Sequence, residues 1–182
     1  MKKLILLSSV LTMFFVMSCR EIVNSVLEVL PPFEVPFSSQ IEVPFATVST
    51  TSYTKAPEIH MDINLNNEIK ANNPNFSIVN LKSVKLSKLS VSYVSSTLGN
   101  KLDVIKNARI YIKGSNLQDK LIATAENNTD PNEIIFTTTD AEIAEYFRSD
   151  RNSLIIEIQG NKVSADQIKM KINAGFKVKA EL

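Results

Sequence analysis

The C-terminal segment, residues 168–182, alternates apolar and polar side chains with a period of two. This alternation predicts one long β-strand that buries one face. At ~3.3 Å per residue such a strand reaches about 50 Å, longer than a typical strand, so we expect a bend at Gly175. The apolar positions are Ile168, Met170, Ile172, Ala174, Phe176, Val178, Ala180 and Leu182.

Three further segments have the same period and predict further strands: residues 81–94, 108–112 and 154–158. In the first of them the apolar positions change parity between Leu86 and Leu89, which predicts a β-bulge near Ser87 and Lys88. Turn-forming residues separate the runs.

Two segments, Phe33–Phe37 and Ile41–Phe45, share the pattern apolar-Glu-Val-Pro-Phe. Proline cannot donate a hydrogen bond to a neighbouring strand, so these segments belong to edge strands or to extended crossings. The alternative is a peptide-like recognition element, in which proline flanks an aromatic residue.

Two other segments have helical signals. Thr139 and Asp140 precede Glu142 and a largely apolar stretch, 143–147, which predicts an N-capped helix of about two and a half turns. A second helix is predicted over residues 63–71.

Short antiparallel strands with two small helices indicate a mainly β fold. We expect an antiparallel β-sandwich, Ig-like or jelly-roll-like, with a core ~10 Å thick. An open β-barrel is the alternative. About 140 residues are enough to bury a core without disulfides.

The first nineteen residues have the pattern of an export signal. Lys2 and Lys3 give a positive start, and residues 4–17 form an apolar run too short to span a ~30 Å hydrocarbon core comfortably. The run ends at Val16-Met17-Ser18-Cys19, which contains the only cysteine of the chain.

This ending resembles the lipobox of bacterial lipoproteins. In that motif an aliphatic residue lies three positions before the cysteine and a small residue lies directly before it. Val16 and Ser18 fit that pattern, and Met17 is bulkier than the residue usual between them. The resemblance implies that residues 1–18 are a cleaved signal peptide and that Cys19 carries acyl chains. The alternative is cleavage nearby by an ordinary peptidase, with Cys19 a small apolar residue.

The resemblance also implies a location. In enteric bacteria an aspartate directly after the lipidated cysteine retains a lipoprotein in the inner membrane, and here that position holds Arg20. We therefore expect a lipid-anchored outer-membrane protein that faces mainly the periplasm, with the cell surface as the alternative. In its last strands and short acidic helix, the chain also resembles small lipoproteins of unknown function from Bacteroidota-type bacteria.

The residues after Cys19 indicate a tether. Apolar residues recur at helical spacing over residues 20–30, and Pro31-Pro32 ends the pattern. We expect a tether over 19–36 with a short amphipathic helix, followed by the β-sandwich domain over 37–182. The helix packs on its own domain or lies on the bilayer.

Composition narrows the chemistry. Lysine and arginine number 20 and the acids 19, a formal charge of +1, so we expect no nucleic-acid partner. One cysteine and one histidine exclude an internal disulfide framework and remove most metal sites and nucleophile relays. We predict no catalytic, cofactor or metal site.

Two short motifs contain residue types that bind metal ions. His60 and Asp62 have the spacing of two ligands, or of a base and its orienting carboxylate. No other ligand converges on them, so we interpret His60 as a surface or structural residue. Residues 127–133 are rich in the oxygen ligands that calcium accepts, but they lack the EF-hand spacing and glycine, and we interpret them as a turn.

Two sets of side chains are candidates for a binding surface. Tyr93, Tyr111 and Tyr146 are candidate platforms for sugar rings in a chain without tryptophan. Seven lysines form either a basic face for anionic lipids or glycans or, as we favour, protection against edge-to-edge aggregation. These are Lys82, Lys85, Lys88, Lys169, Lys171, Lys177 and Lys179.

The pattern as a whole favours a non-enzymatic, membrane-anchored module of the cell envelope that acts as a structural element or by contact with an envelope protein. A lipoprotein that binds a small ligand or glycan is the alternative, and it requires a concave pocket with converging polar groups. An enzyme requires titratable side chains with shifted pKa values clustered in a cleft.

Overall fold

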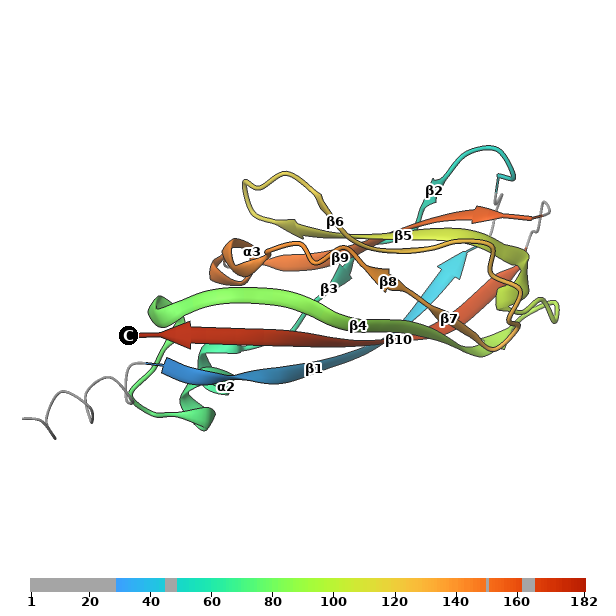
Figure 1. Ribbon diagram of the computed structural model, residues 1–182. Helices are drawn as coiled ribbons and strands as arrows, with labels where there is room; N and C mark the ends of the chain where they lie inside the picture. Colours follow the sequence, from blue (N-terminus) through green and yellow to red (C-terminus); the bar gives the residue numbers. More distant parts are fainter. Residues whose placement is uncertain (1–28, 45–48, 150, 162–165) are drawn as a thin grey trace, which may run out of the picture.

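Two antiparallel sheets face each other in the computed structural model, which describes residues 29–44, 49–149, 151–161 and 166–182 (Figure 1). The predicted β-sandwich is confirmed, and within these residues the sheets do not close into a barrel. Sheet A contains, in spatial order, β1 (Val29–Pro44), β10 (Gln167–Glu181), β4 (Leu81–Ser96) and β7 (Glu133–Ile135). Sheet B contains β2 (Thr54–Lys55), β9 (Asn152–Gly160), β5 (Ile105–Gly114), β6 (Lys120–Ala125) and β8 (Thr137–Thr138), and β3 (Ile59–His60) also pairs with β9.

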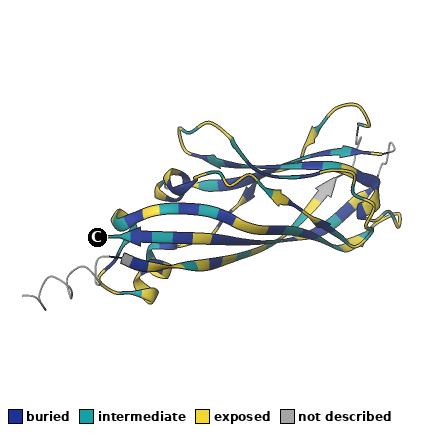
Figure 2. Ribbon diagram, viewed as in Figure 1, coloured by how far each residue is buried: buried dark blue, intermediate teal, exposed yellow. Residues whose placement is uncertain are grey.

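The core lies between the sheets, where strands such as β5 and β10 bury alternate positions (Figure 2). Ile110 and Ile156 of sheet B are directly paired and face sheet A across this core. Phe176 of β10 is 1% exposed and packs edge-on against Phe147, with the ring centroids 5.1 Å apart. Phe147 belongs to the short helix α3 (Ala144–Arg148), which therefore covers part of the core.

β10 buries its even positions from Ile168 to Ala180, as the alternation predicts. Leu182, the last apolar position of the pattern, is exposed because it lies beyond the end of the strand. The predicted bulge is also present. Gly175 pairs with Lys88 and Phe176 pairs with Leu86, so Ser87 is the extra residue in β4.

The segment Phe33–Phe37 and residues 41–44 of the second proline segment lie in one edge strand, β1, which pairs only with β10 among the described strands. Pro36 and Pro44 have the same parity along the strand, and residues of one parity direct their backbone N–H groups away from the neighbouring strand. Neither proline therefore removes a hydrogen bond from the ladder, which is why the edge tolerates them.

The start of β1 changes the predicted domain boundary. The strand begins at Val29, so residues 29–36 belong to the sandwich, whereas the expectation assigned them to a tether. A register shift between Leu30 and Phe33 accommodates the two prolines without ending the strand. A helix was expected over residues 20–30. Val29 and Leu30 are in this strand instead, and residues 20–28 lie outside the described part.

The two helices differ in how well the sequence predicted them. α2 (Leu65–Asn72) agrees with the expected helix, and the side chain of Asn64 caps it by accepting from the N–H of Asn67 at 3.1 Å. α3 is shorter than predicted, and neither Thr139 nor Asp140 caps it. Asp140 instead has a positive φ of 57°, and its side chain binds β4.

Candidate functional site

A hollow of about 860 Å³ lies at the end of the sandwich where α2, β3 and the segment between α3 and β9 meet. We call it the end hollow. It brings together His60 and Asp62, the pair with metal-ligand spacing, and adds Arg148, Arg151 and Asn152. No group of three or more His, Cys, Asp and Glu side chains in the described ranges is close enough to hold a metal ion.

The polar groups of the end hollow are only partly engaged. Arg148 donates from its guanidinium to the main-chain oxygen of Leu81. Asn152 donates to the main-chain oxygen of Tyr146 at 3.4 Å, but its own side-chain oxygen is buried without a partner among the described residues. Two guanidinium groups beside amide and carboxylate groups suit an anionic or hydroxyl-bearing ligand.

The loop over residues 127–133 is a hydrogen-bonded turn. The Asp130 carboxylate accepts from the N–H of Asn132 at 2.7 Å and from the N–H of Glu133 at 3.2 Å. The Asn128 side chain donates to the main-chain oxygen of Leu102 at 2.9 Å. The loop uses its side-chain oxygens to hold its own backbone, which agrees with the interpretation as a turn.

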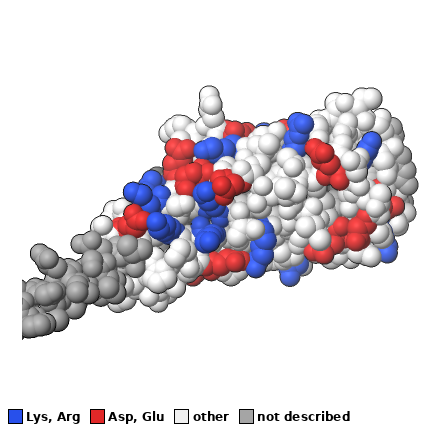
Figure 3. Space-filling model, in the orientation of Figure 1, with Lys and Arg blue, Asp and Glu red and all other residues white. Residues whose placement is uncertain are grey.

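The seven lysines lie on two adjacent strands of sheet A, β4 and β10. Basic and acidic side chains are interspersed on the face of the molecule seen in Figure 3. Lys88 pairs with Glu34 at 2.6 Å, and Lys85 pairs with Asp140 at 2.9 Å. Lys82 and Lys179 share Glu181. The sheet face is therefore a mixed-charge surface rather than a uniformly basic one.

The three tyrosines do not form one platform. Tyr146 is buried and donates to the main-chain oxygen of Gln118 at 2.6 Å. Tyr93 lies 2.9 Å from the Ser96 hydroxyl on sheet A, whereas Tyr111 belongs to sheet B. A stacked pair that the sequence did not suggest lies on sheet B, where the guanidinium of Arg109 is 4.0 Å from the ring centroid of Tyr53.

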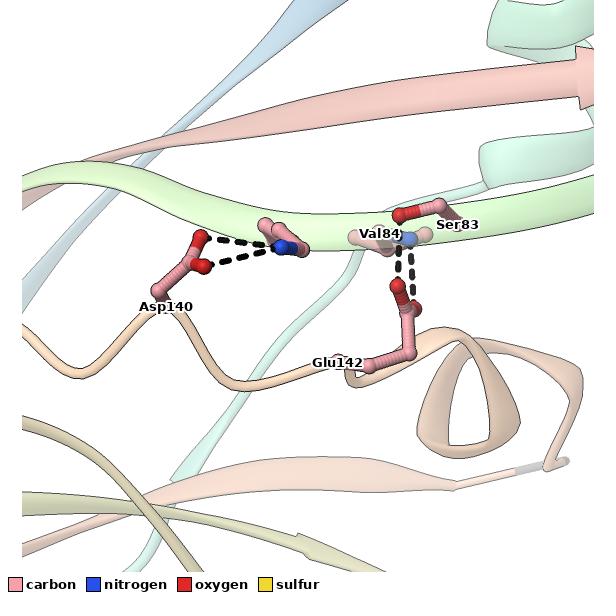
Figure 4. A network of polar contacts seen from close by, with 5 residues as sticks. Ser83, Val84, Asp140 and Glu142 are labelled. Atoms are coloured by element: carbon pink, nitrogen blue, oxygen red, sulfur yellow. Dashed lines mark hydrogen bonds and ion pairs between the residues drawn. The ribbon is translucent and has the colours of Figure 1, made fainter.

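A polar contact holds the chain between β8 and α3 against the open edge of β4 (Figure 4). The Glu142 carboxylate accepts from the N–H of Val84 at 2.8 Å and from the hydroxyl of Ser83 at 2.5 Å. Burial opposes its ionised form, but these donors and the N–H of Ala144 hold the pKa of Glu142 below its ordinary value. The carboxylate thus accepts hydrogen bonds that donors on this edge of β4 would otherwise lack.

Asp166 is a second structural carboxylate that the sequence did not reveal. Its side chain is 3% exposed and accepts from the N–H groups of Thr97, Leu98 and Asn100 and from the Asn100 amide. Burial alone would raise its pKa, but the donors outweigh burial and hold the pKa below the ordinary value. Asp166 therefore fixes the turn after β4, where Gly99 has a φ of 83°.

The remaining shifted groups have local structural causes. The side-chain hydrogen bond from Lys113 lowers the pKa of Glu58, and the same bond raises the pKa of Lys113. The bond from Lys179 lowers the pKa of Glu181, and burial raises the pKa of Tyr146. None of these groups, nor Glu142 or Asp166, lines the end hollow or either of two smaller hollows, of about 600 Å³ and 490 Å³, that residues of β4 and β10 line in part.

Cys19 and the predicted signal peptide, residues 1–18, lie outside the described residues. Within the described part, none of the helices has the length and apolar character needed to cross a bilayer.

No protein-family model matches the chain, and no curated protein matches it. Among solved structures, it is similar to a cyanophage Pam1 capsid protein at 5% identity, covering 83% of this chain and 86% of that chain with a TM-score of 0.35. It is also similar to the SPBc2 prophage-derived protein YomS at 12% identity, covering 80% and 96% with a TM-score of 0.29. A third similar structure is that of FLHE, at 8% identity, covering 83% and 98% with a TM-score of 0.32.

Proposed function

We propose that this chain is a lipid-anchored protein of the bacterial cell envelope whose β-sandwich acts as a non-enzymatic interaction or structural module. The observation that carries the proposal is the Val16-Met17-Ser18-Cys19 ending, because the only cysteine of the chain lies at the end of an export-signal pattern. Two or three acyl chains, each buried methylene adding ~0.8 kcal/mol of membrane affinity, anchor a protein durably.

The start of the sandwich supports this arrangement. β1 begins at Val29, ten positions after Cys19. Ten residues span at most about 33–36 Å when fully extended, so an acylated Cys19 would hold the domain close to the membrane. Arg20 after the cysteine favours the outer membrane, and the periplasmic side is the expected orientation.

The site chemistry favours contact over catalysis. The shifted carboxylates are occupied in holding turns and strand edges, as Glu142 and Asp166 are, and they lie apart from the hollows. After removal of residues 1–18 the balance becomes 18 basic against 19 acidic residues. A nearly neutral module would recognise an envelope protein by contact rather than by electrostatic steering.

The end hollow favours a second candidate function, the binding of a small anionic or hydroxylated ligand. Arg148, Arg151 and Asn152 supply polar side chains at its wall. Saturable binding of a soluble sugar or small anion, lost in Arg151→Ala, distinguishes this candidate from the interaction module.

Metabolic labelling with palmitate, combined with membrane fractionation, tests the proposal. The wild-type chain should take up label and partition with the outer membrane. Cys19→Ala should take up no label and should either appear in the soluble envelope fraction or remain as a precursor, whereas Arg20→Ala should still be labelled. Wild type and Cys19→Ala that partition alike without label would overturn the proposal.

A further inference from the structure

The start of β1 and the C-terminus lie at one end of the sandwich (Figure 1). The 3₁₀-helix η1 (Ile78–Asn80) directly precedes β4 at this end, and its residue Ile78 lines the end hollow. The strand register shows this directly, because Val29 pairs with Glu181 and Leu81 pairs with Ala180. We call this the anchor-side end, since the chain from Cys19 enters the domain there.

Two apolar side chains of the anchor-side end are exposed. Val79 is 83% exposed in η1, and Leu182 is 62% exposed beyond the end of β10. At the opposite end of the sandwich, Leu98 is 71% exposed, so exposed apolar residues alone do not distinguish the two ends.

Two cations of the anchor-side end have no acidic partner among the described residues. Arg148 and Arg151 make no ion pair with a described carboxylate, and Lys82 and Lys179 share the single carboxylate of Glu181. Among the described residues that line the end hollow, Asp62 is the only acidic one, and Glu68 and Lys70 of α2 offset each other. Arg148 and Arg151 are exposed, so both can meet anionic lipid headgroups.

The length of the chain outside the sandwich decides which end faces the bilayer. The ten positions from Cys19 to Val29 reach at most about 33–36 Å. The fifteen residues of β10 extend about 50 Å at ~3.3 Å per residue. The tether is therefore shorter than the domain and favours contact through the end at which it enters.

We propose that the anchor-side end rests on the anionic headgroup surface of the membrane, with Val79 and Leu182 in contact with lipid and Arg148 and Arg151 facing headgroup phosphates. This inference rests on the proposed acylation of Cys19. It assigns the opposite end, with Leu98 and the turn held by Asp166, to the side available for an envelope partner.

The test uses the full acylated chain in vesicles of phosphatidylethanolamine and phosphatidylglycerol. Acylated Cys19 does not react with thiol probes, so Val79→Cys and Leu98→Cys each give one labelling site for a polarity-sensitive fluorophore. The probe at position 79 should shift to shorter wavelength and be quenched by a lipid-attached nitroxide. The probe at position 98 should show neither change.

A second pair of variants tests the role of charge. In the Val79→Cys background, Arg151→Gln should reduce quenching in vesicles that contain phosphatidylglycerol and should leave it unchanged in phosphatidylcholine vesicles. Lys101→Gln, an exposed cation at the opposite end, should leave quenching unchanged in both.

The outcomes separate the two proposals. A vesicle-bound, acylated chain with equal quenching at positions 79 and 98 overturns the membrane-facing end and leaves the anchor intact. A chain that carries no acyl group and does not bind vesicles overturns both.

Discussion

The Glu34 carboxylate and the Lys88 ammonium meet 2.6 Å apart across β10, although Glu34 belongs to β1 and Lys88 to β4. They reach each other over Gly175, where an added Cβ would lie 2.2 Å from the Glu34 carboxylate and 2.9 Å from the Ser87 hydroxyl. The glycine thus lets one ion pair bridge three strands of sheet A.

The first prediction concerns this bridge. A double-mutant cycle with Glu34→Ala and Lys88→Ala should give a coupling energy of about 0.2–1 kcal/mol, the range for exposed pairs. In the Gly175→Ala background the coupling should fall toward zero, because the new methyl displaces the carboxylate. Urea unfolding of a soluble form beginning at residue 20 measures both values, and an unchanged coupling would show that the glycine is not required.

The second prediction concerns the two faces of β10. Phe176→Ala should lower the free energy of unfolding by ~3–5 kcal/mol, since it removes a buried ring packed on Phe147. Lys177→Ala, at the next and exposed position, should change it by less than about 0.5 kcal/mol. Equal losses in the same urea titration would contradict a strand with one buried face.

The long alternating segments were the most predictable part of the fold. In β10, apolar residues at every second position predict which face is buried. In its partner β4, the change from even to odd apolar positions predicts the bulge. Both patterns can be seen in a single sequence. The start of β1 was not predictable in this way, because Pro31 and Pro32 read as a break and only pairing with β10 compensates for them.

The polar contacts were invisible for a different reason. Asp166 binds Asn100, 66 positions earlier, and Glu142 binds Val84, 58 positions earlier. No local pattern links such distant residues, so the sequence did not reveal the hydrogen bond between Glu142 and β4. The helix cap expected at Asp140 was wrong. The end hollow likewise joins His60 to Arg148 and Arg151 only through the tertiary fold.

The third prediction separates a structural carboxylate from a surface one. Glu142→Ala should lower the free energy of unfolding by about 1–3 kcal/mol, because the N–H of the buried residue Val84 loses its partner. Asp140→Asn should cost about 0–1 kcal/mol, since it removes only an exposed pair with Lys85 and asparagine tolerates the positive φ. If thermal or urea unfolding shows the reverse order, Glu142 does not hold this edge.

The fourth prediction concerns pH. The folded pKa of Asp166 is below its ordinary value of 3.8, so its ionised form stabilises the fold above that value, and this contribution is lost as pH falls through the folded pKa. The difference in unfolding free energy between wild type and Asp166→Asn should therefore be present at about pH 7 and shrink toward about pH 3. A difference independent of pH would assign the effect of the substitution to packing alone.

Acylated Cys19 is, in our proposal, the first residue of the mature protein. Intact-mass and N-terminal peptide mass spectrometry of the membrane-extracted chain tests it most directly. The extracted chain should begin at Cys19 and carry a diacylglyceryl group, with a further acyl chain on its amino group. A chain that retains residues 1–18, or that begins elsewhere with an unmodified Cys19, would contradict the account.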